Sequence, residues 1–122
     1  MSGLIRTVAL VGMMGAGKSS IGRRLAGKLG VPFCDADAEI ETAAGCSINE
    51  IFDRYGEDAF RDGERKVIAR LLTDPPHVLA TGGGAFIDDE IRTNIKERCF
   101  SAWISVPLDI LVTRVSRRNT RP

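Results

Sequence analysis

The sequence predicts an α/β fold in which helices cover both faces of a parallel sheet, giving three layers. Two observations favour this fold class. Short apolar segments rich in β-branched residues alternate with longer segments whose apolar residues recur at helical spacing. The apolar segments show no polar alternation, which is typical of strands that are buried on both faces.

The elements follow in order along the chain. The first strand is expected at Thr7–Val11, and Ile21, Leu25 and Leu29 then define a helix that stops at Gly30. A second strand, Val31–Cys34, precedes a helix from about Asp37 to Ala44 that ends at Gly45. The remaining expected elements are a helix opened by a capping box at Ser47–Glu50, a helix at Glu57–Leu72, a strand at Val78–Thr81, a helix at Asp89–Glu97, a strand at Phe100–Ser105 and a helix at Leu108–Ser116.

Size and composition limit the classes of function. The 122 residues suffice for one domain, residues 1–122, and the net charge of +1 provides no field that attracts nucleic acid or an anionic membrane. No apolar run is long enough for a membrane span, and Met1–Arg6 lack the pattern of a secretion signal. We therefore expect a cytoplasmic protein with reduced thiols at Cys34, Cys46 and Cys99 and without nucleic-acid or membrane partners.

A phosphate-binding motif lies between the first strand and the first helix. Residues 12–19 read GMMGAGKS, which fits the pattern G-x-x-x-x-G-K-[ST] in the required context. The backbone N–H groups and the helix N-terminus attract phosphates, Lys18 reaches the β- and γ-phosphates, and Ser19 offers a hydroxyl to Mg²⁺. The expected ATP-binding residues here are Gly12, Gly15, Ala16, Gly17, Lys18, Ser19 and Ser20.

Two acids follow the second strand. Strand carboxyl ends face the ligand crevice of an open α/β sheet, so Asp35 and Asp37 are expected near the phosphate-binding motif. Asp35 is expected to assist Mg²⁺ through water, and Asp37 to accept the proton of an attacking hydroxyl. The alternative for Asp37 is a helix cap with no catalytic role.

Charged residues interrupt the apolar stripe of the helix predicted at Glu57–Leu72. Glu64 falls near the centre of this stripe and Arg61 at its edge. The two either pair only with each other, or Glu64 orients Arg61 to clamp a substrate carboxylate. Three consecutive glycines, Gly82–Gly84, follow the third strand, either as a connector or because the backbone approaches a ligand there.

Taken together, these motifs resemble the shikimate kinases over the whole chain. The resemblance rests on the phosphate-binding motif, the D-x-D after the second strand, Phe60-Arg61 with Glu64, and the triple glycine, in that family's order. It implies a P-loop NTPase fold of the nucleoside-monophosphate-kinase type with strand order 2-3-1-4-5, and transfer of phosphate from ATP to shikimate. The shikimate-binding residues that it implies are Asp37, Arg61, Gly82, Gly83 and Gly84.

The arginine-rich end of the chain resembles the start of this family's lid. The lid is expected to begin near Arg114, with Arg121 over the ATP phosphates as a catalytic and ATP-binding residue. Family elements beyond this step, including a fifth strand, have no counterpart before Pro122, so a shortened chain is expected, and the full-length form is expected to be a monomer. A gluconate-type kinase and a nucleotide-binding module without turnover remain alternatives.

Overall fold

A parallel sheet forms the centre of the molecule, and its strand order agrees with the prediction. The computed structural model describes residues 6–11, 17–82, 88–103 and 108–119. Within these ranges the strands run in the order β2-β3-β1-β4, all parallel. Their bounds are β1 at Thr7–Val11, β2 at Phe33–Asp35, β3 at Val78–Ala80 and β4 at Cys99–Trp103.

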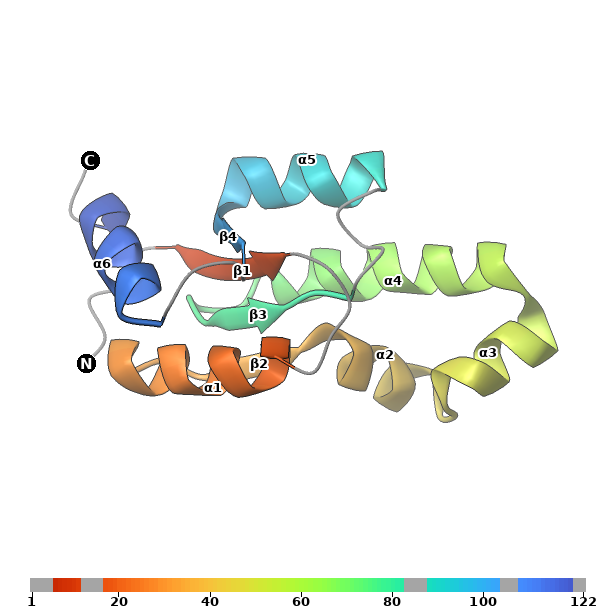
Figure 1. The fold of residues 1–122 in the computed structure, drawn as a ribbon. Helices are drawn as coiled ribbons and strands as arrows, with labels where there is room; N and C mark the ends of the chain where they lie inside the picture. The colour runs from red at the N-terminus through yellow and green to blue at the C-terminus, as the bar shows by residue number, and fades with distance from the viewer. Residues whose placement is uncertain (1–5, 12–16, 83–87, 104–107, 120–122) are drawn as a thin grey trace.

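The helices cover both faces of this sheet. Figure 1 shows α1 and α6 on one side and α4 and α5 on the other, whereas α2 and α3 extend past one end of the strands. In the parts of the chain that the structure describes, no helix has the length and apolar character of a membrane span. The bounds are α1 at Gly17–Leu29, α2 at Ala36–Ala44, α3 at Ile48–Tyr55, α4 at Glu57–Leu71, α5 at Asp89–Arg98 and α6 at Leu108–Asn119.

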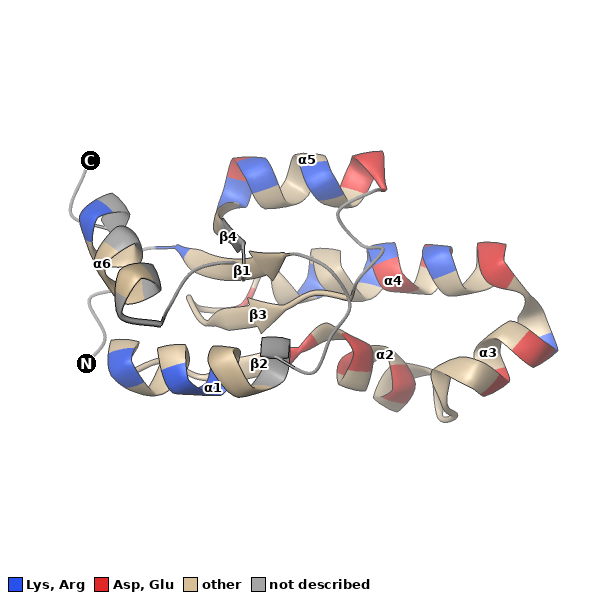
Figure 2. Cartoon of the chain, viewed as in Figure 1, with Lys and Arg blue, Asp and Glu red and all other residues tan. Residues whose placement is uncertain are grey.

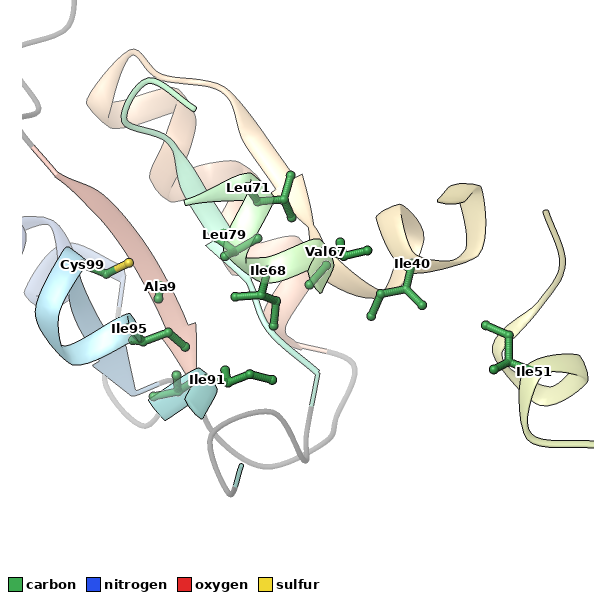
Figure 3. Close-up of a cluster of buried hydrophobic side chains, with 12 residues drawn as sticks. Ala9, Ile40, Ile51, Val67, Ile68, Leu71, Leu79, Ile91, Ile95 and Cys99 are labelled. Carbon is green, nitrogen blue, oxygen red and sulfur yellow. The ribbon is translucent and has the colours of Figure 1, made fainter. Parts of the chain in front are cut away.

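Alternate residues of β1 divide the core into two apolar clusters. Ala9 and Val11 join the cluster beneath α4 and α5, which also contains Ile68, Ile91 and Cys99 (Figure 3). Val8 and Leu10 join the other, beneath α1 and α6. All five residues of β1 are buried, as expected for a strand covered on both faces. Burial raises the pKa of the Cys99 thiol to about 11, so this thiol stays protonated near neutral pH.

A glycine allows α1 to lie close to β2. A Cβ atom built on Gly22 would be 2.3 Å from Cε1 of Phe33 and 3.2 Å from Cδ1 of Leu10. Both distances are shorter than ordinary van der Waals contact, so no larger side chain fits without displacing the Phe33 ring. The helix that follows the phosphate-binding motif is therefore packed directly on the strand that leads to Asp35 and Asp37.

The helix ends confirm most of the predicted start and stop signals. Gly30 and Gly45 have φ angles of +69° and +75°, the left-handed conformation typical of glycine after a helix. Ser47 and Glu50 form the predicted capping box of α3. The cap of α2 differs: it is Asp35, whose Oδ1 accepts hydrogen bonds from the N–H groups of Asp37 and Ala38.

Candidate active site

The carboxyl ends of β1, β2 and β3 lie at the same edge of the sheet and bring the predicted site residues together. Thr81 connects two of these strand ends, because its Oγ1 donates to the Leu10 carbonyl oxygen at 2.8 Å and its N–H donates to the same oxygen at 3.2 Å. The end of β3 is thereby held against the strand that leads into the phosphate-binding motif. This edge is where open α/β sheets bind their ligands.

The first turn of α1 contains the last residues of the phosphate-binding motif. The helix begins at Gly17, so Lys18 and Ser19 lie where the helix presents free N–H groups. The structure says nothing of their side chains; Ser20 is exposed. The first turn of α1 carries no acid, whereas α2, α3, α4 and α5 each carry at least one there. Gly12, Gly15 and Ala16 fall outside the described residues.

Asp35 and Asp37 lie close together, and only Asp35 caps the following helix, α2. Asp35, the last residue of β2, caps α2 through Oδ1, at 2.9 Å from the Asp37 nitrogen and 3.4 Å from that of Ala38. The capping role considered for Asp37 therefore belongs to Asp35. Asp37 lies in the first turn of α2, and its half-buried side chain points toward the end of β3. Its carboxylate therefore lies at the edge of the sheet where the strands end.

Gly82 lies so close to the carboxylate of Asp37 that a larger residue would require this side chain to move. A Cβ atom built on Gly82 would be 2.8 Å from Oδ1 of Asp37 and 3.4 Å from Oε2 of Glu64. The predicted close approach of the triple glycine to another group thus exists at its first residue, and the group is protein. Gly83 and Gly84 lie outside the described residues.

Arg61 forms an ion pair with Glu57. Its Nε and Nη2 donate to Oε1 of Glu57 at 3.0 Å and 2.6 Å, one helical turn earlier in α4. The partner predicted for Arg61 within this helix was Glu64, whereas its ion pair is with the exposed Glu57. Exposed pairs of this kind contribute little to stability, so another carboxylate could compete with Glu57 for the guanidinium.

Glu64 is buried, as its place in the apolar stripe predicts. Only 3% of the residue is exposed. Burial raises the pKa of its carboxyl, and the negative charge of Asp37 raises this pKa further, while Arg61 lowers it. Two carboxyl groups and one guanidinium therefore influence one another here. Figure 2 shows that the charged residues of the neighbouring helices α2 and α3 are mainly acidic and that those of α1 are basic.

Two interactions of α4 were not predicted from the sequence. Arg65 of α4 forms an ion pair with Asp88, the N-cap of α5, at 2.8 Å. The rings of Phe52 and Phe60 stack with their centroids 4.8 Å apart, just before Arg61. An acid before a helical segment was a recognisable signal for the cap at Asp88, but not for its ionic partner.

The predicted metal and lid residues are only partly described. Within the described ranges, no group of three or more His, Cys, Asp or Glu side chains is arranged to hold a metal ion. Asp35, the residue predicted to assist the metal ion through water, caps α2 through Oδ1. The predicted start of the lid, near Arg114, falls within α6, which continues to Asn119 and buries Val115 in the core. Arg121 lies outside the described residues.

Comparison with known proteins identifies the family. The family model described as shikimate kinase matches residues 14–122. A curated shikimate kinase of Caulobacter vibrioides strain NA1000 is 62% identical over 96% of this chain. The chain spans 58% of the length of that relative.

Solved structures agree with this match. The shikimate kinase from Acinetobacter baumannii in complex with shikimate superposes with a TM-score of 0.79 at 40% identity, covering 96% of this chain and 65% of the other. A gluconokinase from Sinorhizobium meliloti 1021 superposes with a TM-score of 0.57 at 19% identity, over 95% of this chain and 66% of the other. This second likeness concerns the fold alone.

Proposed function

Because the chain belongs to the shikimate kinase family, we propose that the protein transfers the γ-phosphoryl group of ATP to a hydroxyl group of shikimate. The observation that carries this proposal is the approach of Asp37 to Gly82, with Glu64 beside them on the helix of Arg61. These groups lie at the sheet edge where β1 leads into the phosphate-binding motif. A hydroxylated acid bound there would lie between the carboxylate and the phosphates.

The phosphate-binding motif holds the nucleotide in this proposal. The N–H groups at the start of α1 attract the phosphates, together with the motif residues Gly12, Gly15, Ala16, Gly17, Ser19 and Ser20. Lys18 opposes the negative charge that develops during transfer. Arg121 would add a second positive charge, an assignment that rests on the resemblance of R-P at residues 121–122 to the family lid.

The acceptor is bound and activated by the residues at the ends of β2 and β3. Arg61 exchanges Glu57 for the substrate carboxylate, and its planar fork can hold both oxygens of that group. Asp37 accepts the proton of the attacking hydroxyl as the new O–P bond forms and the bond to ADP breaks. Gly82, Gly83 and Gly84 allow the substrate to approach the backbone.

Magnesium is the cofactor that this reaction requires. When bound, Mg²⁺ would neutralise part of the charge of the phosphates. Ser19 would supply a hydroxyl to the ion, and Asp35, at the carboxyl end of β2, would contact its waters. We further propose that residues 1–122 form one kinase domain and that the full-length protein is a monomer, which sedimentation would test.

A panel of acceptors tests the proposed activity. ADP release is measured with ATP, Mg²⁺ and, separately, shikimate, gluconate or no acceptor, for the unsubstituted protein and for Lys18→Ala. We expect turnover with shikimate, little with gluconate, and a loss of several orders of magnitude in Lys18→Ala with unfolding unchanged. Turnover with gluconate alone would favour the second kinase class. Nucleotide binding without any product would instead indicate a binding module.

A further inference from the structure

The ion pair between Arg65 and Asp88 differs from the ion pairs formed within α4. It joins α4 to the start of α5, 23 residues away, whereas Arg61–Glu57 and Lys66–Asp62 each lie within α4. The Asp88 side chain is only 7% exposed, whereas both side chains of the Lys66–Asp62 pair are more than half exposed. A pair that is shielded from water on one side constrains its two elements more than a solvated one.

Both oxygens of Asp88 are engaged. Oδ1 accepts hydrogen bonds from the N–H groups of Glu90 and Ile91 at 3.0 Å and 3.1 Å, and Oδ2 accepts from Nε of Arg65 at 2.8 Å. Burial raises the pKa of Asp88, but the hydrogen bonds from Ile91, Arg65 and Glu90 and the charge of Arg65 outweigh it, so the pKa lies below its usual value. Asp88 therefore remains charged at neutral pH and fixes the first turn of α5 to α4.

Consecutive residues of α4 lie near the chain on either side of residues 83–87. Gly82 lies against Glu64 and Asp37, and Asp88 is bound by Arg65, the residue after Glu64. Arg61 precedes Arg65 by four residues, so both lie on the same face of the helix. A change in the Arg65–Asp88 contact would rotate or shift this face of α4 relative to the end of β3.

The charged groups at this edge also act on one another. The pKa of Glu64 is raised by Asp37 and Asp88 and lowered by Arg61 and Arg65, in addition to the effect of burial. The Arg65–Asp88 pair therefore lies within electrostatic reach of the groups assigned to substrate binding and proton transfer. It balances one positive against one negative charge beside Glu64.

We propose that Arg65 and Asp88 are positioning residues for the acid-substrate site. Their ion pair fixes the face of α4 that carries Arg61 and Glu64 relative to Asp37 and Gly82, and so sets the affinity for the substrate carboxylate. Neither residue contacts the reacting atoms in this assignment. The inference rests on the proposed kinase function.

Steady-state kinetics of matched variants test this role. Arg65→Met removes the charge and keeps the apolar stem, Asp88→Asn keeps an oxygen that can cap α5, and Arg65→Lys retains a charge. We expect Arg65→Met to raise KM for shikimate about fivefold, or ~1 kcal/mol, with kcat and KM for ATP within twofold of the unsubstituted protein. Arg65→Lys should recover part of the loss, because its ammonium can still pair with Asp88.

A double-mutant cycle and a neighbouring control complete the test. Asp88→Asn should raise KM as much as Arg65→Met, and the double variant should lose no more than either alone. Lys66→Met, which breaks the exposed pair one residue further along α4, should leave every constant within twofold. All assays are run well below the unfolding midpoint of each variant.

Three outcomes would overturn the inference. They are an unchanged KM for shikimate in Arg65→Met, an equal rise in KM for ATP, or losses that add in the double variant. If the unsubstituted protein neither binds nor phosphorylates shikimate, the proposed function fails and the inference fails with it. Normal turnover in the unsubstituted protein together with any of the three outcomes refutes the positioning role alone.

Discussion

Replacing Gly82 with alanine is expected to separate activity from stability. The added methyl group would lie 2.8 Å from Oδ1 of Asp37, 3.6 Å from its Cγ and 3.4 Å from Oε2 of Glu64. Restoring an ordinary contact of 3.4 Å requires the Asp37 oxygen to move by about 0.6 Å, the difference between 3.4 and 2.8 Å. The carboxylate ends a short side chain and can rotate, so the strain falls on its orientation and not on the backbone.

The effects on stability nearly cancel. Turning Asp37 away from a preferred rotamer costs roughly 0.5–1.5 kcal/mol. Alanine restricts the unfolded chain and returns roughly 0.4–1 kcal/mol, because Gly82 is not among the glycines with positive φ. The net change in the free energy of unfolding is therefore within about 1 kcal/mol, or a Tm shift of about 5 °C. A catalytic group displaced by about 1 Å costs on the order of 100-fold in rate, so kcat should fall to between a tenth and a hundredth.

The assay pairs kcat for shikimate phosphorylation with urea unfolding. Gly27→Ala is the matched control, because nothing lies within 4 Å of a Cβ atom built there and Gly27 is inside α1. This control should keep its kcat and gain roughly 0.5–1 kcal/mol in stability from helix propensity. If Gly82→Ala keeps kcat within threefold, the contact does not govern the position of Asp37. A loss of more than about 3 kcal/mol would show that the side chain cannot turn away.

Further substitutions test the packing and the site. Gly22→Ala should lower the free energy of unfolding, measured in urea, by roughly 1–3 kcal/mol, because its methyl group meets the Phe33 ring. A change below about 0.5 kcal/mol would contradict this packing. Asp37→Asn should reduce kcat at least about 100-fold with ATP affinity retained, whereas Arg61→Lys should mainly raise KM for shikimate; loss of ATP binding by calorimetry would refute either role. Glu64 has a raised pKa in the folded state, so its contribution to stability is complete below its usual pKa of 4.5 and is lost as the pH rises through the folded value. The free energy of unfolding is measured for the unsubstituted protein and for Glu64→Gln between about pH 4 and about pH 8. The unsubstituted protein should lose stability relative to Glu64→Gln as the pH rises, and parallel pH profiles would disprove the raised pKa.

The sheet and the identity of the site residues could be predicted because they depend on local patterns. Apolar runs located each strand to within two residues, and the apolar stripe of α4 placed Glu64 inside. The choice of the helix cap could not be made from spacing. Asp35 and Asp37 both stand at a junction of strand and helix, and the cap went to Asp35 because β2 extends to it with φ −107° and ψ 116°.

Partners of charged residues were harder to predict than their positions. Arg61 has acids three residues after it and four residues before it, and helical geometry allows either pair. The structure places Glu57 in solvent and Glu64 in the core, and this difference in burial decides the hydrogen bonds. The Arg65–Asp88 pair spans 23 residues, so only the packing of α5 on α4 brings it together.

The position of β2 has a consequence for how the protein responds to heat. This strand has three residues and stands at one end of the described sheet, where it is hydrogen-bonded to β3 alone. Its amides should exchange with deuterated water sooner than those of β1, which has a strand on each side. Since β2 leads directly into the turn that carries Asp37, detachment of this strand removes the proposed base while the core under α4 and α5 is still intact. On warming, activity should therefore be lost before global unfolding begins. The temperature at which activity is lost should depend on how well α1 packs on Phe33 of β2.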